Sequence, residues 1–277
     1  KRRRLCVDAN PHLTTVAVCD KKFSDNGHLD DGVAYSQSFS KLFDHDLDAV
    51  LVCMSNDMAA EITIAALARG LHVFCEKPMA SNSAEAKKIL GISSEKFTLG
   101  YLGSVGSWYM LVEMLQYFKL LKLENPASHF LFITNSDKSI IHTEAMKQNI
   151  NISDITIKAV SHPDVPKYMK ASDMSICFIK DVYSKKASSP TKIGEILNMG
   201  IPIVINDIGD ARIISENCSG VQLLNYFDEN SIIESFKNNS SFLNINPLDI
   251  RNKSIEFYSL DKGLVKYNKA YLDLSKA

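Results

Sequence analysis

Residues 97–109 read Phe-Thr-Leu-Gly-Tyr-Leu-Gly-Ser-Val-Gly-Ser-Trp-Tyr, and the fold follows from this stretch. Its first six residues are mostly apolar or aromatic, which is typical of a buried strand. Gly100, Gly103 and Gly106 come at three-residue spacing, so the chain can turn tightly and leave backbone amides open to a ligand. Ser107 is placed to cap a helix that begins near residue 108. The stretch predicts a strand, a glycine loop and a helix; a plain tight turn without a ligand is the alternative.

The same alternation of short apolar runs and longer amphipathic runs continues toward the end of the chain. Unbroken apolar strands separated by helices are typical of a parallel sheet covered on both faces. The predicted strands are 97–102, 129–134, 155–160, 174–179, 201–205 and 220–224, and the predicted helices are 108–123, 140–148, 163–171, 191–199, 211–216, 228–237, 247–258 and 261–274. These elements suffice for a complete α/β domain of the doubly wound, Rossmann-like kind, which we place at 93–277.

Upstream, the pattern is the same but shorter. Strands are predicted at 15–19, 48–53 and 72–75, with helices at 58–68 and 83–90. Three strands are too few for a whole doubly wound sheet. Residues 1–92 are therefore predicted to form a second, incomplete Rossmann-like domain with a parallel sheet.

The composition is that of an ordinary globular protein and excludes several classes. Of the 277 residues, 45% are hydrophobic and 23% charged, and the net charge of −1 argues against binding nucleic acid through overall basic charge. No apolar run approaches the ~18 residues of a membrane span, and no long apolar stretch follows the basic start as in a secretory signal. The six cysteines form no C-x-x-C pair, so no zinc site or redox motif is expected, and we expect a reducing, cytoplasmic location.

Two motifs in the first domain point to a dinucleotide site. Asp20 ends a predicted strand, where a Rossmann fold holds the adenosine ribose hydroxyls, although it could equally just end the strand. The strand at 72–75 runs into Glu76-Lys77-Pro78. Together these features resemble the nucleotide-binding half of the Gfo/Idh/MocA oxidoreductases over about residues 1–90. The resemblance implies that Asp20, Glu76 and Lys77 belong to an NAD(P) site, with Lys77 near the nicotinamide and the substrate.

The glycine loop of that family is missing from this sequence. A G-x-G-x-x-G loop is expected about 20 residues before the ribose acid, but the first glycine is Gly27. Without the loop, no helix N-terminus is aimed at a pyrophosphate. We therefore expect the NAD(P) site to be vestigial, and an NAD(P)-dependent oxidoreductase is the second hypothesis for function.

Residues 187–195 read Ala-Ser-Ser-Pro-Thr-Lys-Ile-Gly-Glu and predict a helix start suited to a phosphate. Ser189 is expected as the N-cap, with proline at the first helical position, so that free amides and the positive end of the helix dipole face an anion. Lys192 adds a positive charge in the first turn. Glu195 follows three residues later, so a surface ion pair between Lys192 and Glu195 is the alternative.

These elements resemble the donor-binding domain of group 1 glycosyltransferases of the GT-B fold (family 4-like), over about residues 97–274. The resemblance implies that Glu195 holds the donor ribose hydroxyls and that Lys192 meets the diphosphate, and we expect these two residues to be catalytic. The other donor-binding residues that it implies are Gly103, Ser104 and Gly106 in the glycine loop, Ser161 and His162 near the base, and Ser189 and Thr191 at the helix start. A helix capping box at 161–164 is the alternative role for His162.

Two features depart from that family. Many members carry a Glu on the donor sugar at the position of Ala187. Many also carry an Arg and a Lys around the glycine loop, and 103–109 contains neither. Lys192, together with Lys185 or Lys186, could supply the missing charge.

The expected function is binding of a nucleoside diphosphate sugar, of UDP or GDP type, for glycosyl transfer to an unknown acceptor in polysaccharide or glycoconjugate biosynthesis. The resemblance to group 1 glycosyltransferases implies transfer with retention of configuration. No metal or other cofactor is expected to be required, because cationic side chains and helix amides stabilise the leaving diphosphate. No D-x-D metal pair appears in the donor region. The alternatives are the NAD(P)-dependent oxidoreductase and a nucleotide-binding remnant without turnover.

Overall fold

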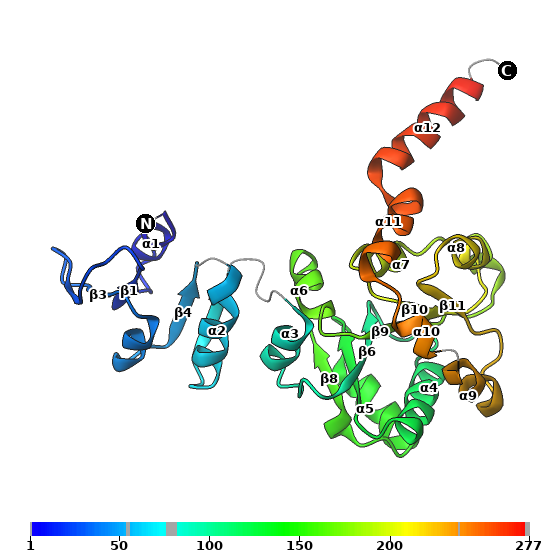
Figure 1. The fold of residues 1–277 in the computed structure, drawn as a ribbon, viewed down its shortest axis with the longest axis horizontal. Coiled ribbons are helices and arrows are strands. Elements are labelled where there is room, and N and C mark those ends of the chain that lie inside the picture. Colours follow the sequence, from blue (N-terminus) through cyan, green and yellow to red (C-terminus); the bar gives the residue numbers. More distant parts are fainter. Residues whose placement is uncertain (1, 54–55, 76–81, 238, 275–277) are drawn as a thin grey trace. The chain divides into compact units, whose positions relative to one another are not determined.

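The computed structural model describes residues 2–53, 56–75, 82–237 and 239–274. The chain divides into two compact units, Lys1–Ser81 (unit 1) and Asn82–Ala277 (unit 2), which are described separately (Figure 1). Helix α3 (Ser83–Ile89) groups with unit 2. Its Lys87 is buried, and the Nζ atom lies 2.7 Å from Oδ2 of Asp173.

Unit 2 is built on one six-stranded sheet. Its strands are β6 (Phe97–Leu102), β7 (Ser128–Ile133), β8 (Ile155–Lys158), β9 (Met174–Cys177), β10 (Ile203–Ile205) and β11 (Val221–Leu223). They lie in the order β11-β10-β9-β6-β7-β8, and every pairing is parallel. The predicted doubly wound α/β fold is confirmed for this unit.

The strand order creates a switch point at the centre of the sheet. The chain leaves β6, adds β7 and β8 on one side, and then returns to place β9 on the other side of β6. Loops that leave β6 and β9 therefore diverge, and the crevice between them at the carboxyl ends of the strands is where open α/β sheets bind ligands. Every residue of β7, β9 and β10 is buried, so these central strands form a stable base for the loops at their carboxyl ends.

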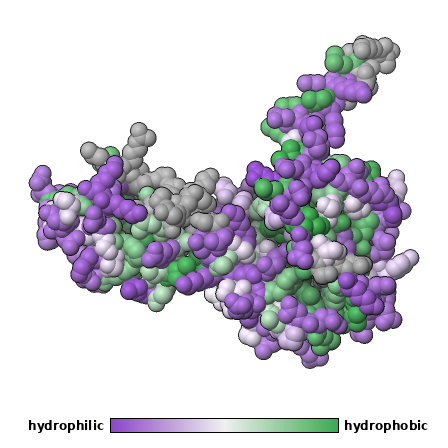
Figure 2. Space-filling view, in the orientation of Figure 1, coloured by the Kyte–Doolittle hydropathy of each residue, from purple (hydrophilic) through white to green (hydrophobic). Residues whose placement is uncertain are grey.

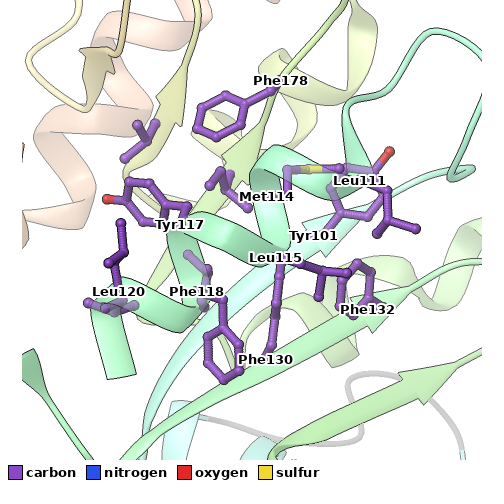
Figure 3. Close-up of a cluster of buried hydrophobic side chains, with 14 of the residues drawn as sticks. Tyr101, Leu111, Met114, Leu115, Tyr117, Phe118, Leu120, Phe130, Phe132 and Phe178 are labelled. Atoms are coloured by element: carbon purple, nitrogen blue, oxygen red, sulfur yellow. The ribbon is translucent and has the colours of Figure 1, made fainter. Parts of the chain in front are cut away.

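The helices of unit 2 cover the sheet. Besides α3 they are α4 (Leu111–Glu124), α5 (Lys138–Lys147), α6 (Val165–Met169), α7 (Thr191–Asn198), α8 (Ala211–Asn217), α9 (Glu229–Lys237), α10 (Asn239–Leu243), α11 (Pro247–Tyr258) and α12 (Leu260–Leu274), with short 3-10 turns at His162–Asp164 and Tyr183–Lys185. The core centres on α4, whose Met114, Leu115 and Phe118 are fully buried beside the rings of Phe130 and Phe132, which contact each other at a tilt (Figure 3). This packing anchors β6 and β7, which carry the glycine loop.

Helix α4 begins at Leu111, three residues later than the sequence pattern predicts. The predicted cap by Ser107 is wrong: Ser107 has a φ of 51°, and no side chain caps the helix. Trp108 and Tyr109 instead run beside the segment that follows β9, where Tyr109 bridges Ile179. This long-range pairing holds the two aromatic residues out of the helix.

Helix α12 is amphipathic and largely exposed. Figure 2 shows hydrophobic and hydrophilic residues side by side along it. Leu260, Leu264, Tyr267 and Tyr271 recur on one face and are all exposed. In the described part of the chain, no helix has the length and apolar character needed to cross a membrane.

Unit 1 contains two small groups of strands in its described residues. Strands β1 (Ala17–Cys19), β2 (Gly27–His28) and β3 (Ala34–Ser36) lie in the order β1-β3-β2, and β4 (Ala49–Val52) pairs in parallel with β5 (His72–Cys75). The helices are α1 (Arg2–Asp8), a 3-10 helix at Phe39–Asp44 and α2 (Asn56–Leu67). Its core is small, with Val50, Val52, Ile62 and Ala66 at the centre.

Candidate functional site

The glycine loop lies at the switch point of the unit 2 sheet. It leaves β6 through Gly103, whose amide donates to the carbonyl of Ile133 at 2.9 Å. Gly103 and Gly106 have φ angles of +115° and +83°, a region that side chains disfavour, so glycine is required for the turn. The loop is then tied to the exit of β9, because the Lys180 amide donates to the carbonyl of Trp108 at 2.9 Å.

Lys192 reaches from the first turn of α7 to this loop. Its Nζ lies 3.4 Å from the ring centroid of Tyr109 and 4.9 Å from that of Tyr101. It also donates to the Tyr101 hydroxyl at 3.4 Å. A Cβ at Gly103 would come within 2.5 Å of this Nζ, so a side chain at 103 would displace the ammonium group from its present position. The structure thus brings together Lys192 and Gly103, which were both predicted as donor-binding residues.

The surroundings of the Lys192 ammonium are aromatic rather than acidic. In the described ranges of the chain, no carboxylate lies within 4 Å of its Nζ. Burial lowers the pKa of Lys192, while Glu195 at longer range opposes the shift. Cys177 at the end of β9 adds no negative charge, because burial raises the pKa of this thiol to about 11. The cation is held in place by two tyrosine rings and, among the residues that the structure describes, lacks a close counter-ion.

Glu195 pairs with His162, and not with Lys192. The Oε1 atom of Glu195 lies 3.2 Å from Nε2 of His162, and the side chains are 39% and 83% exposed. The alternative of a Lys192–Glu195 surface ion pair is therefore wrong. The capping-box alternative for His162 is seen in part: Ser161 occupies the N-cap position of the His162–Asp164 turn, but its hydroxyl donates to the Asp164 carboxylate and makes no capping bond to the backbone.

The start of α7 differs from the prediction at Ser189. Pro190 occupies the N-cap position and Thr191 is the first helical residue, so the predicted N-cap role of Ser189 is wrong. Ser189 instead donates through its hydroxyl to Oδ2 of Asp210 at 2.5 Å. The physical reason is the close approach of Gly209, where an added Cβ would lie 1.9 Å from the Ser188 carbonyl. Contact with this neighbouring loop, rather than the local capping preference, orients the residues before the helix.

A pocket of about 190 Å³ lies beside the Lys192 cluster. It is lined by Trp108, Tyr109, Ile179, Lys185, Ser188, Ser189 and Pro190. The Nζ of Lys185 lies 4.8 Å from the ring centroid of Trp108, which is 46% exposed. Tyr101, Trp108 and Tyr109 were not predicted as site residues, although the last two directly follow the glycine loop in the sequence.

A second pocket of about 380 Å³ lies at the carboxyl ends of β9, β10 and β11. Its lining is Met110, Asp181, Asn206, Asp207, Arg212, Asn225, Tyr226 and Phe227. Asn206 is committed to structure, because its side chain bonds both backbone groups of Ile179. Arg212 pairs with Asp207. Across the described residues, no group of three or more His, Cys, Asp or Glu side chains is arranged to hold a metal ion.

In unit 1, the predicted dinucleotide residues are only partly described. Asp20 follows β1 and is exposed; its Oδ1 accepts from the Lys22 amide at 3.0 Å, and its own amide donates to the Ser36 carbonyl. This carboxylate closes a local turn and still faces solvent. Glu76 and Lys77 lie outside the described residues.

Comparison with known proteins gives different results for the two parts of the chain. Residues 3–99 match the family described as "Oxidoreductase family, NAD-binding Rossmann fold". The chain is 39% identical to the myo-inositol 2-dehydrogenase of Thermotoga maritima over 57 residues, which are 21% of this chain and 17% of that enzyme. The predicted resemblance of the first part to the Gfo/Idh/MocA oxidoreductases is confirmed, while the chain spans only a small share of such a relative.

Solved structures with a similar fold are glycosyltransferases. One from Rickettsia africae ESF-5 has a TM-score of 0.56 at 15% identity, over 70% of this chain and 52% of that chain. Anabaena HepE, in complex with UDP and glucose, has a TM-score of 0.52 at 12% identity, over 83% of this chain and 63% of that chain. This chain spans less than two thirds of the length of these proteins. The likeness shows the fold, and the predicted resemblance to GT-B glycosyltransferases is confirmed at that level.

Proposed function

We propose that unit 2 binds a nucleoside diphosphate sugar and that this donor is used for glycosyl transfer. The observation that carries the proposal is Lys192, a half-buried cation at the switch point of the sheet without a carboxylate within 4 Å in the described residues. A buried charge without a partner is costly, and an anionic ligand removes that cost. A diphosphate is the anion that this kind of crevice accommodates at the carboxyl ends of parallel strands.

Two backbone elements add to the charge of Lys192. The first turn of α7 presents amides without helical partners, and the helix dipole favours an anion there. The glycine loop approaches the same ammonium through Gly103. In this proposal Lys192, Ser189 and Thr191 meet the diphosphate or the sugar from α7. The loop residues Gly103, Ser104 and Gly106 meet the phosphates from the other side.

The nucleoside half of the donor is assigned to Glu195 and His162. These side chains lie together at 3.2 Å, one turn along α7 from Lys192 and at the start of the 3-10 turn after β8. A carboxylate accepts hydrogen bonds from both hydroxyls of a ribose. We assign Glu195 to the ribose, and Ser161 and His162 to the base. The UDP bound to the similarly folded Anabaena HepE supports a nucleotide donor.

The proposed reaction is a metal-independent transfer with retention of configuration. The bond between the anomeric carbon and the diphosphate oxygen breaks, and the anomeric carbon bonds to an acceptor hydroxyl oxygen, whose proton passes to the departing diphosphate. Lys192 stabilises the negative charge that develops on the leaving oxygen, and Glu195 holds the ribose so that the diphosphate lies at Lys192. We propose a polysaccharide or glycoconjugate as the acceptor. This chain spans less than two thirds of the length of the glycosyltransferases that share its fold. The acceptor site and turnover are therefore proposed together with donor binding.

Calorimetric titration tests this function directly. UDP, GDP and NAD(H) are titrated into the whole chain and into a Glu195→Ala variant, with Glu216→Ala as a control because Glu216 is exposed on α8. We expect UDP or GDP to bind the parent and the control equally and the Glu195 variant about tenfold more weakly. Equal binding by all three chains would refute the role of Glu195. Absence of nucleoside diphosphate binding would refute the proposed function.

A second candidate function is supported by the family match of residues 3–99. In unit 1, the carboxylate of Asp20 remains exposed and could accept ribose hydroxyls, but the described residues before it include no glycine and so no close-approach phosphate loop. The residues present fit NAD(P) only at the ribose. We therefore derive no hydride transfer from this unit, and binding of NAD(H) without UDP or GDP in the same titration would favour the oxidoreductase alternative.

A further inference from the structure

The pocket beside Lys192 has the size of one sugar ring. Its volume is about 190 Å³, whereas pockets for drug-sized ligands occupy about 300–1,000 Å³. Tyr109 belongs both to this pocket and to the Lys192 cluster, because its ring centroid is 3.4 Å from the lysine Nζ. A diphosphate held at Lys192 therefore places its attached sugar next to Tyr109, at this pocket.

The residues that line the pocket carry one full charge at neutral pH, and it is positive. Lys185 is the only lysine among them, and none of them is an aspartate or glutamate. Neutral sugars are usually held through carboxylates and amides that accept from their hydroxyls, since ionised carboxylates provide several acceptor sites. Here the lining offers serine hydroxyls, aromatic rings and an ammonium group instead.

The Lys185 side chain is held at the pocket by its neighbours. Its Nζ lies 4.8 Å from the centroid of the Trp108 ring, a cation–π contact. Its backbone is also constrained: its amide donates to the Val182 carbonyl at 2.8 Å, and the Ser188 amide donates to its carbonyl at 3.0 Å. Its ammonium is therefore positioned before any ligand arrives, and no carboxylate ion pair with it occurs in the described ranges.

We infer that the transferred sugar carries a carboxylate, so that the donor is a nucleoside diphosphate uronic acid. This inference rests on the proposed function. The Lys185 ammonium donates to the sugar carboxylate, and the exposed part of the Trp108 ring packs against the ring carbons. Ser189 accepts from a sugar hydroxyl, because its own hydroxyl proton is already donated to Asp210. Lys192 remains available for the diphosphate, so the two lysines recognise different groups of the same ligand.

The test compares ligands that differ only at the sugar. UDP, UDP-glucose and UDP-glucuronate, and likewise GDP, GDP-mannose and GDP-mannuronate, are titrated into the whole chain at two salt concentrations. We expect the acidic sugar to bind about tenfold more tightly than its neutral counterpart, with the difference shrinking at high salt. Lys185→Met should remove this difference and leave the affinity for free UDP or GDP unchanged. Lys186→Met is the matched control, because Lys186 is the exposed neighbour and does not line the pocket.

Each outcome bears on one of the two proposals. Equal affinity for acidic and neutral sugars, with UDP or GDP still bound, would overturn the uronic acid inference and leave the proposed function standing. A loss of affinity for free UDP or GDP in Lys185→Met would overturn it as well, since Lys185 would then meet the diphosphate. Absence of binding by every nucleotide would overturn the proposed function and this inference together.

Discussion

Replacing Lys192 with methionine should weaken nucleotide binding strongly without unfolding the protein. The ammonium group lies against the rings of Tyr109 and Tyr101, at 3.4 Å and 4.9 Å from their centroids. Methionine is unbranched and flexible, so it fills the same channel beside Gly103 with a neutral chain. The change therefore removes the positive charge and little of the packing.

The contacts of Lys192 set the expected size of the change in nucleotide affinity and of the change in the free energy of unfolding. In the complex, Lys192 would contribute one or two charge-assisted hydrogen bonds to the diphosphate, so its loss costs about 2–3 kcal/mol, or a rise of roughly 30- to 150-fold in Kd. In the free protein, the variant loses cation–π contacts but is relieved of a partly desolvated charge that has no close counter-ion within the described ranges. These terms oppose each other, so the free energy of unfolding should change by less than about 1 kcal/mol.

Calorimetry with UDP or GDP and urea denaturation measure the two quantities on the same samples. The parent chain should bind more weakly as salt rises, and the variant should show a flatter salt dependence. Because burial lowers the pKa of Lys192, affinity in the parent should begin to fall at a lower pH than for an ordinary lysine. Lys186→Met serves as the charge-matched control. An unchanged Kd in the Lys192 variant, or a loss of more than about 2 kcal/mol in unfolding free energy, would refute the reasoning.

Three further predictions concern the same unit. Gly103→Ala should lower the free energy of unfolding by about 1–3 kcal/mol because of the φ of +115°, and it should also weaken UDP or GDP binding by displacing Lys192. Gly91→Ala is the control: its φ is +70° with open space around it, so it should lower the free energy of unfolding through backbone strain without changing nucleotide affinity. Equal nucleotide affinity in the two variants would contradict the close approach of Gly103 to Lys192. Tyr109→Leu should raise the Kd about fivefold by removing the ring under the ammonium, and Tyr109→Phe should leave it nearly unchanged in the same titration. Burial and nearby Lys96 lower the pKa of His129 to about 4, so the unfolded chain takes up a proton between about pH 6.5 and 4 that the folded chain does not. The contribution of His129 to the free energy of unfolding should therefore be fully present above about pH 6.5, and the free energy of unfolding should fall by about 2 kcal/mol toward pH 4.5. If denaturation curves of His129→Gln show the same fall, His129 is not its source.

Local physics accounts for the parts of unit 2 that were predicted correctly. Apolar runs of strand length separated by amphipathic runs indicate parallel strands with helices on both faces, and the six strands appear close to the predicted positions. Gly103 and Gly106 also stand out locally, because their positions demand backbone angles that other residues avoid. Lys192 was placed in the first turn of α7 for the same reason: helix starts have a recognisable composition over a few residues.

Other features of the site depend on residues far apart in the chain, and local pattern could not reveal them. Trp108 and Tyr109 look like the start of a helix, but a turn from Gly106 to Tyr109 and the pairing of Tyr109 with Ile179 keep them out of the helix, beside Lys185 and Lys192. Glu195 sits at ideal spacing for an ion pair with Lys192, yet it faces His162.

The residue types needed to meet an anion can therefore be read from the chain: glycines for the turn, a lysine in the first turn of a helix, and a serine before it. Which of them face one another, and which find other partners, follows from the order of strands around the switch point. The reason is that strand and helix preferences act over a few residues, whereas the contacts of Lys192 with Tyr101 and of Ser189 with Asp210 join parts of the chain 91 and 21 residues apart. Such contacts form only when the whole sheet has assembled.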